Sequence, residues 1–409
     1  MKPIIRFRQY NKEWCPFKLN TILVPSNEKN TKGLYSKNDV LSVSGEAGIV
    51  NQIAFQGRSF AGASVLNYGV VNTNDIVYTK SPLRNNPYGI IKTNNGPSGI
   101  VSTLYAIYNC CEESCPQFVD TYFTSSSRTN NYLRPLVRKG AKNDMKVSSE
   151  GALQGNVIFP YKDEQIEIAS YFRILDAKLQ ASAKKVDSLK KLKSASLVAM
   201  FPQNGESTPK VRFKGFEGEW KETTLSECLD ISYLQNSENK YDKNDVLSVS
   251  DDFGVMNQIE LLGRSYAGKD VSSYSILQKG EIVYTKSPLK DKPFGIIKKN
   301  SYQTGIVSIL YAVYHSKDNI SADYIHYYFD PAWRLNAYMR PLVNKGAKNT
   351  MNISDEMALM GSLIIPPSLA EQQAIAAYFR SLDRKIALET ARLEKLKQIK
   401  LACLDKMFV

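Results

Sequence analysis

The string IVYTKSPL occurs twice in this chain, beginning at Ile76 and again at Ile282. The offset of 206 residues between the copies continues outside the string, because NDVLSVS, NQI, GRS, RPLV and KGAKN recur at the same spacing. After Pro160 and Pro366 the offset becomes 207, and it then holds along the rest of each copy. The chain is therefore a tandem duplication of a unit of about 200 residues, which indicates repeated domains, since solenoid and propeller repeats run to about 20–50 residues.

Each copy has two unlike parts. The first part combines short runs rich in Val, Ile, Thr and Tyr, such as DIVYTKS and GIVSTLYAIY, with loops of Gly, Asn, Ser and Pro, which predicts strands and turns. Ahead of the RPLV segment of the second copy, Ser321 is expected to cap a helix reaching Phe329, and Asp330-Pro331 to begin another helical turn. The first part is therefore predicted to be mixed α and β.

The second part is predicted to be one long helix. Residues 164–201 contain no Gly or Pro, and at about 1.5 Å per residue such a helix is about 57 Å long. Apolar residues at alternating steps of three and four predict a coiled-coil seam, with gaps at Ser182, Lys193 and Ser196. Ser368 and Glu371 are expected to form a capping box at the start of the second helix. The predicted seam consists of Phe172, Leu175, Leu179, Val186, Leu189, Phe379, Leu382, Ile386, Leu393 and Leu396.

A helix with a single apolar seam is unstable alone in water, and its duplicate is the obvious partner. A pseudo-twofold axis between the copies would make the helices antiparallel and place one globular head at each end, in a dumbbell of α+β class. A parallel arrangement, with both heads at one end, stays open. The expected boundaries are 1–162 for the first domain, 163–201 for its helix, 202–211 for a linker, 212–368 for the second domain and 369–409 for its helix.

Charge indicates the kind of partner. The chain has 53 Lys and Arg against 40 Asp and Glu, a net charge of +13, which favours nucleic acid or an acidic surface. No apolar run approaches the roughly 18 residues needed to cross a membrane, and the N-terminus lacks a signal-peptide core, so we expect a cytoplasmic protein without membrane contact.

The duplicated motifs resemble those of a known family. Each copy opens with R-F and E-W, at Arg6-Phe7 and Glu13-Trp14 in the first, and continues after its first part with P…EQ…I…F…LD. Over its whole length the chain resembles the specificity subunit of type I restriction-modification systems. The resemblance implies two target recognition domains that each read half of a bipartite site in double-stranded DNA. It further implies antiparallel helices that set the spacing and help bind two modification subunits, with restriction subunits completing the complex.

The motifs of catalysis are missing. Asn85-Asn86-Pro87-Tyr88 lacks the second-position proline of an amino-methyltransferase loop, and no phosphate-binding G-x-x-x-x-G-K-S/T string occurs. Cys110, Cys111 and Cys115 cluster without a nearby His and have no cysteine counterparts in the second copy, so a zinc site is not expected. We therefore expect a non-catalytic chain without cofactors, with S-adenosylmethionine, ATP and Mg²⁺ on partner subunits only. A single-chain restriction enzyme, or a coiled-coil scaffold that binds no DNA, are the alternatives.

Candidate DNA contacts follow from residue type and loop context. Arg in G-R-S can fork onto guanine or phosphate, the Asn-Gln pairs can bind adenine, and the lysines of Y-T-K-S-P and K-G-A-K-N can bind phosphate. For each group, a capped turn or a solvated loop is the alternative. The candidates are Asn51, Gln52, Arg58, Ser59, Lys80, Lys139, Lys142 and Asn143, with Asn257, Gln258, Arg264, Ser265, Lys286, Lys345, Lys348 and Asn349 in the second copy.

Overall fold

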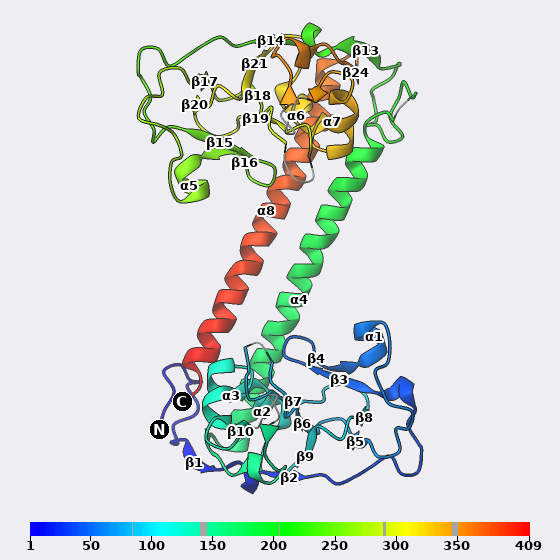
Figure 1. The fold of residues 1–409 in the computed structure, drawn as a ribbon, viewed down its shortest axis with the longest axis vertical. Coiled ribbons are helices and arrows are strands. Elements are labelled where there is room, and N and C mark those ends of the chain that lie inside the picture. The colour runs from blue at the N-terminus through cyan, green and yellow to red at the C-terminus, as the bar shows by residue number, and fades with distance from the viewer. Residues whose placement is uncertain (84, 140–144, 204, 289–291, 346–350) are drawn as a thin grey trace. The chain divides into compact units, whose positions relative to one another are not determined.

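The computed structural model describes residues 1–83, 85–139, 145–203, 205–288, 292–345 and 351–409 (Figure 1). Within it the chain packs as two compact units, one formed by residues 1–183 with 391–409 and the other by 184–390. Our boundaries treated the long helices as segments of their own, whereas here each helix contributes to both units. We call residues 1–161 head 1 and residues 202–368 head 2.

The described residues of head 1 form a four-stranded antiparallel sheet in the order β2-β9-β6-β7 and four two-stranded ribbons. The strands predicted from DIVYTKS and GIVSTLYAIY are confirmed as β6, β8 and β9. The sheet consists of β2 (Leu23–Pro25), β9 (Ala106–Cys110), β6 (Ile76–Tyr78) and β7 (Ile91–Thr93). The ribbons are β1 (Cys15–Lys18) with β12 (Asn156–Phe159), β3 (Leu41–Ser44) with β4 (Gly48–Asn51), β5 (Gly69–Val71) with β8 (Gly99–Val101), and β10 (Arg138–Lys139) with β11 (Met145–Lys146).

The duplicated octapeptide forms the centre of the head. All three residues of β6 are fully buried, because alternate side chains of a strand point to opposite faces and both faces are covered here. Ile76 and Tyr78 belong to the main core, beside helices α2 (Pro116–Tyr122) and α3 (Ser126–Leu133), and Val77 belongs to a smaller core behind the sheet. The recurrence of IVY is thus explained by packing.

Head 2 repeats this plan. Its sheet has the order β14-β21-β18-β19, and its helices α6 and α7 stand where α2 and α3 stand in head 1. The predicted cap is confirmed, since Ser321 Oγ accepts a hydrogen bond from the Tyr324 amide and α7 begins directly after Pro331. The elements are β13 (Lys221–Thr224), β14 (Leu229–Ile231), β15 (Leu247–Ser250), β16 (Gly254–Asn257), α5 (Gln258–Leu262), β17 (Ser275–Leu277), β18 (Ile282–Tyr284), β19 (Ile297–Lys299), β20 (Gly305–Val307), β21 (Ala312–Ser316), α6 (Ala322–Tyr328), α7 (Ala332–Met339), β22 (Asn344–Lys345), β23 (Met351–Asn352) and β24 (Ser362–Ile365).

The two predicted long helices are α4 (Lys162–Ala199) and α8 (Leu369–Lys406). Of the predicted seam, Phe172, Leu175, Phe379 and Leu382 are buried, and the remaining seam residues are half-buried. Two of the expected gaps are filled by polar contacts in unit 2, where Ser196 Oγ lies 3.0 Å from the Tyr378 hydroxyl and Lys193 binds Asp383 at 2.8 Å. The seam residues closest in sequence to the preceding head are therefore buried, and those farther along each helix are half-buried.

Within each unit, the contacts between α4 and α8 show that the two helices run in opposite directions. In unit 1, the Tyr171 hydroxyl contacts Cys403 Sγ, and Asp176 contacts Lys400. Residue numbers rise along α4 as they fall along α8, so these segments are antiparallel. The same order holds in unit 2, where Lys185 pairs with Glu389 and Lys193 with Asp383. The complete dumbbell stays a prediction.

The residues that directly follow each long helix lie in a hydrophobic core. In unit 1, Phe408 packs with its ring centroid 5.7 Å from Phe118 and 6.3 Å from Trp14. In unit 2, Phe201 is fully buried and lies 6.4 Å from Trp220, the counterpart of Trp14. The chain at the end of α8, which follows head 2, thus packs into the core of head 1, and the chain at the end of α4, which follows head 1, packs into the core of head 2. From the sequence, these residues were expected only as the ends of the spacer helices.

The R-F, E-W and E-Q motifs that carry the family resemblance meet in buried ion pairs. Both carboxylate oxygens of Glu164 accept hydrogen bonds from Arg6 at 2.7 Å, and the Trp14 indole donates to the same carboxylate at 3.3 Å. In unit 2, Arg212 binds both oxygens of Glu371, at 2.7 and 2.8 Å. The side chains of Glu164 and Glu371 are 2% and 1% exposed. The motifs therefore tie the entrance of each copy to the start of its long helix.

This pairing changes the predicted capping box. Glu371 was expected to return to the backbone of Ser368, but its two oxygens are bound to Arg212, while the Ser368 carbonyl accepts from the Glu371 amide. An arginine distant in sequence supplies two charge-assisted hydrogen bonds, which are about twice as strong as neutral ones.

The glutamine of each E-Q motif accepts a hydrogen bond from the backbone amide of the residue that caps a short helix. Gln165 Oε1 accepts from the Cys115 amide at 2.9 Å, and Gln372 Oε1 accepts from the Ser321 amide at 2.9 Å. Cys115 and Ser321 are the N-cap residues of α2 and α6. The motif therefore also fixes the first helix of each head against the long helix.

Candidate nucleic-acid interface

The candidate asparagines cap short helices. Asn51 Oδ1 accepts from the Ala54 amide at 3.1 Å at the start of α1 (Gln52–Gln56), and its Nδ2 donates to the Asn38 carbonyl at 2.6 Å. Asn257 repeats both contacts at the start of α5. Because local bonds use both ends of each amide, the observed role is the capped turn, and bidentate adenine binding by these side chains stays a prediction that would require these bonds to break.

The candidate glutamines hold the loop that follows α1 and α5. Gln52 Oε1 accepts from the Phe60 amide at 2.7 Å, and its Nε2 donates to Ser42 Oγ at 3.2 Å. Gln258 makes the equivalent bonds in head 2, to the Tyr266 amide at 2.6 Å and to Ser248 at 3.1 Å. These glutamines position the G-R-S segment against the hairpin.

The candidate serines turn the chain after each arginine. Ser59 Oγ accepts from the Ala61 amide at 3.3 Å, and Ser265 Oγ accepts from Ala267 at the same distance. Their hydroxyls also lie near the Oε1 atoms of Gln52 and Gln258, at 3.5 and 3.4 Å respectively. Both serines shape the loop that presents the arginines.

Arg58 and Arg264 are exposed, and each lies over an exposed aromatic ring. The guanidinium carbon is 4.6 Å from the ring centroid of Phe60 in head 1 and 4.6 Å from that of Tyr266 in head 2. These rings are 57% and 61% exposed, and sequence reasoning did not select them. A stacked arginine keeps its N–H groups free at the edge, which suits a base edge or a phosphate.

Lys80 and Lys286 follow β6 and β18 with left-handed backbone, at φ 46° and 47°. The amino group of Lys286 binds Asp355 Oδ1 at 2.6 Å. Lys139 and Lys345 end β10 and β22, while Lys142, Asn143, Lys348 and Asn349 lie outside the described residues.

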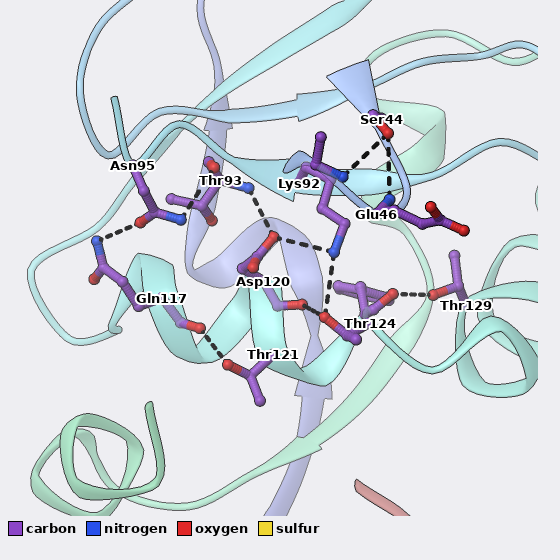
Figure 2. A network of polar contacts seen from close by, with 12 residues as sticks. Ser44, Glu46, Lys92, Thr93, Asn95, Gln117, Asp120, Thr121, Thr124 and Thr129 are labelled. Carbon is purple, nitrogen blue, oxygen red and sulfur yellow. Dashed lines mark hydrogen bonds and ion pairs between the residues drawn. The ribbon is translucent and has the colours of Figure 1, made fainter. Parts of the chain in front are cut away.

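In head 1, Lys92 of β7 is buried and joins this strand to α2 and the residue pair that follows it. Figure 2 shows the amino group of Lys92 directed at Asp120 and Thr124, at 3.6 and 3.2 Å, below Ser44 and Glu46. A hollow of about 350 Å³ beside it is lined by residues of the hairpin tip, the 83–86 loop and the start of α3. The signal in the sequence was a charged residue recurring inside an apolar strand, in IIKT and IIKK.

Ion pairs occupy the equivalent place in head 2. Asp251 at the tip of the β15–β16 hairpin binds Lys292 at 2.6 Å and Lys298 at 3.3 Å, and Lys298 also binds Asp330 at 2.7 Å. Head 1 has Gly45, Asn86 and Thr124 at the positions of Asp251, Lys292 and Asp330. These three differences between the copies are far apart in the sequence but lie together in the structure. They give the two heads different surfaces at this place.

His326 makes unit 2 sensitive to acid. Burial, reinforced by the nearby charge of Lys298, lowers the pKa of His326 from its ordinary 6.5 to about 4. The unfolded chain binds this proton more tightly, so stability is complete above about pH 6.5 and falls by about 3 kcal/mol on acidification to pH 4, at about 1.4 kcal/mol per pKa unit. We expect urea unfolding of His326→Gln to lose this pH dependence.

Unit 1 serves as the internal reference for this experiment, because Asp120 occupies the position of His326. Hydrogen exchange should show the loss of protection between pH 6.5 and 4 in unit 2 peptides of the unmodified chain. Burial opposes ionisation of Asp330, but Lys298 and Lys193 outweigh it and lower its pKa, so its contribution is lost only at more acidic pH. An unchanged profile in the His326 variant would contradict the prediction.

All six cysteines are free, and burial raises the pKa of Cys110 to about 11, which disfavours the reactive thiolate. Among the residues that the structure describes, no group of three or more His, Cys, Asp or Glu side chains could hold a metal ion. None of the helices formed by these residues combines the length and the hydropathy of a membrane span.

Comparison with protein families identifies the class of domain. Residues 217–398 match the family model of the type I restriction modification DNA specificity domain. This match confirms the resemblance drawn from the duplicated motifs. No curated protein sequence matches the chain.

Three solved structures from type I systems are similar to this chain. The type I restriction-modification S subunit from M. genitalium is 14% identical, with a TM-score of 0.59 over 100% of this chain and 99% of that one. The HsdS subunit from Thermoanaerobacter tengcongensis is 17% identical, with a TM-score of 0.45 and 98% of each chain covered. A chain from a structure on assembly and conformational transition of a type I system is 15% identical, with a TM-score of 0.47 over 97% of this chain and 98% of that one. The first comparison shows that the α+β fold is that of an S subunit over its full length.

Proposed function

We propose that this chain is the sequence-specific DNA-recognition subunit of a type I restriction-modification complex. Head 1 and head 2 each read one half of a bipartite, near-palindromic site. The observation that carries the proposal is the recurrence of an exposed arginine stacked on an exposed aromatic ring, Arg58 on Phe60 and Arg264 on Tyr266, at equivalent places in two copies of the fold. The family match of residues 217–398 supports it.

The rest of the complex follows from the same proposal. The chain acts in the cytoplasm without catalysis or cofactors of its own, and it directs adenine methylation by two modification subunits and cleavage by restriction subunits. S-adenosylmethionine, ATP and Mg²⁺ bind those partners. The long helices α4 and α8 form an antiparallel spacer in a pseudo-twofold dumbbell, which suits a duplex because DNA has dyads of its own.

The recognition site is expected to be close to an inverted repeat. Heads related by a twofold axis meet opposite strands in the same way, and GRS, YTKSP and KGAKN are present in both. The half-site centres should lie about one turn, roughly 10 base pairs, apart, with an outer limit near 17 base pairs set by the helix length. The differences around Asp251 and Lys292 should break the symmetry at one or two positions. Methylome sequencing of cells that express the chain with its modification subunits measures this, and two unrelated half-sites would contradict it.

The purified chain alone is expected to be catalytically silent. It should neither transfer methyl groups from S-adenosylmethionine to DNA nor cut DNA with ATP and Mg²⁺, because its described residues offer no metal cluster and its sequence lacks the methyltransferase and ATP-binding motifs. The co-expressed complex is the positive control. Either activity in the isolated chain, at a level above that of contaminating enzymes in the preparation, would overturn the proposal.

A further inference from the structure

Lys80 and Lys286 leave their strands in the same unusual conformation. Both have left-handed backbone, at φ 46° and 47°, although neither is glycine. The preceding Thr79 and Thr285 each accept, through Oγ1, a hydrogen bond of 3.1 Å from the amide of Ile90 or Ile296. Left-handed residues other than glycine, asparagine and aspartate are uncommon and concentrate at functional sites. The two lysines are therefore a matched pair whose surroundings can be compared directly.

One carboxylate distinguishes their surroundings. Lys286 Nζ binds Asp355 Oδ1 at 2.6 Å, with the two side chains 19% and 31% exposed. At the position of Asp355, head 1 has Ser149. No acidic group lies within ion-pair distance of Lys80 in the described part of head 1. Lys80 therefore has a free charge where Lys286 has a neutralised one.

The backbone at this position is held alike in both heads. The Tyr108 hydroxyl donates to the Ser149 carbonyl at 3.0 Å, and the Tyr314 hydroxyl donates to the Asp355 carbonyl at 3.2 Å. The following residue is glutamate in both copies, Glu150 and Glu356, so it does not account for the difference. An aspartate at position 149 would therefore be placed to reach Lys80.

The other lysines near this strand do not offer the same free charge. Lys92 lies 3.6 Å from Asp120, and its counterpart Lys298 binds Asp330 and Asp251. Both are nearly buried, at 7% and 3% exposed. Lys299, which ends β19, binds Asp323 at 2.8 Å. Of the five lysines in and after the equivalent strands, Lys80 is the one whose amino group can approach an external anion without breaking an ion pair among the described residues.

We propose that Lys80 binds a phosphate of the DNA backbone, whereas Lys286 is held by Asp355 and does not. The inference rests on the proposed function and divides the work of the heads. Head 1 makes one more phosphate contact and anchors the duplex, and head 2 depends more on its other contacts. Phosphate contacts fix position and register without carrying sequence information.

The test measures how affinity depends on salt. The full chain is titrated with a fluorescein-labelled mixed-sequence DNA duplex between 50 and 200 mM salt, and log K is plotted against log [salt]. Each phosphate contact contributes about 0.9 to the slope, or about 3.5-fold in affinity over this range. Lys80→Ala and Ser149→Asp should each lower the slope by about this amount, and Lys80→Arg should retain it. Lys286→Ala should leave it unchanged, and Asp355→Ser should raise it.

Controls separate the possible failures. Lys18→Ala, an exposed lysine on β1, removes the same charge elsewhere and should leave the slope unchanged. Circular dichroism melting of each variant verifies folding, and Ser149→Asp and Asp355→Ser report independently of any lysine removal. If the unmodified chain shows no salt-dependent DNA binding, the proposed function fails. If it binds but Lys80→Ala and Ser149→Asp keep its slope, or Lys286→Ala lowers the slope as much as Lys80→Ala does, this inference alone is overturned.

Discussion

Replacing Phe408 by alanine is expected to destabilise unit 1 by about 3–5 kcal/mol, the usual cost of truncating a buried phenylalanine. Phe408 is 5% exposed and lies among the rings of Trp14, Phe118 and Phe172. The truncation would leave a cavity that these large, mutually packed rings can fill only in part. Hydrogen exchange followed by mass spectrometry should show faster exchange in α2 and in the β1–β12 ribbon.

The duplicated fold provides the matched control. Phe201→Ala removes the equivalent ring from the core of unit 2, where Phe201 is fully buried, and should accelerate exchange there by a similar factor. Phe408→Leu keeps most of the volume and should cost less than about 1.5 kcal/mol. Unchanged protection of unit 1 in Phe408→Ala would show that the end of α8 contributes little to that core.

Removing Arg212 is expected to cost about 3–5 kcal/mol, because it leaves a buried carboxylate without its cation. Glu371 is 1% exposed, and both of its oxygens accept hydrogen bonds from Arg212. The indole N–H of Trp220 has no hydrogen-bond partner among the described residues, so it does not replace the lost bonds as the structure stands. Urea unfolding of Arg212→Ala, monitored by exchange in unit 2, measures the cost.

A double variant separates the pair from its burial. Arg212→Met with Glu371→Leu removes both charges and should be markedly more stable than Arg212→Ala, because no unpaired charge stays buried. Arg6→Ala in unit 1 should cost less than Arg212→Ala, since Trp14 continues to donate to Glu164 at 3.3 Å. Equal losses in the single and double variants would show that the pair contributes packing only.

Much of the candidate site could be located from the sequence but not described from it. The duplicated strings identified the loop that presents Arg58 and Arg264, because an exposed loop conserved between two copies within one chain stands out in a comparison of the copies. The same reasoning selected Asn51 and Gln52, whose amides are used in local hydrogen bonds. Residue type shows what a side chain can bind. Whether its polar atoms are already used in hydrogen bonds or ion pairs depends on the neighbours that the fold brings close.

The sequence by itself determined the duplication, the strands and the two long helices, because periodicity and caps act over a few neighbouring residues. The tertiary structure alone decided which residues meet over long distances along the chain. It placed Phe201 and Phe408 in cores that include the other copy's head, gave Glu371 to Arg212 instead of Ser368, and paired Lys286 but not Lys80 with a carboxylate. Apart from the contact of Phe201 with Trp220, these contacts join residues about 70 to 400 positions apart, where the path of the whole backbone, and no local preference, sets the distance.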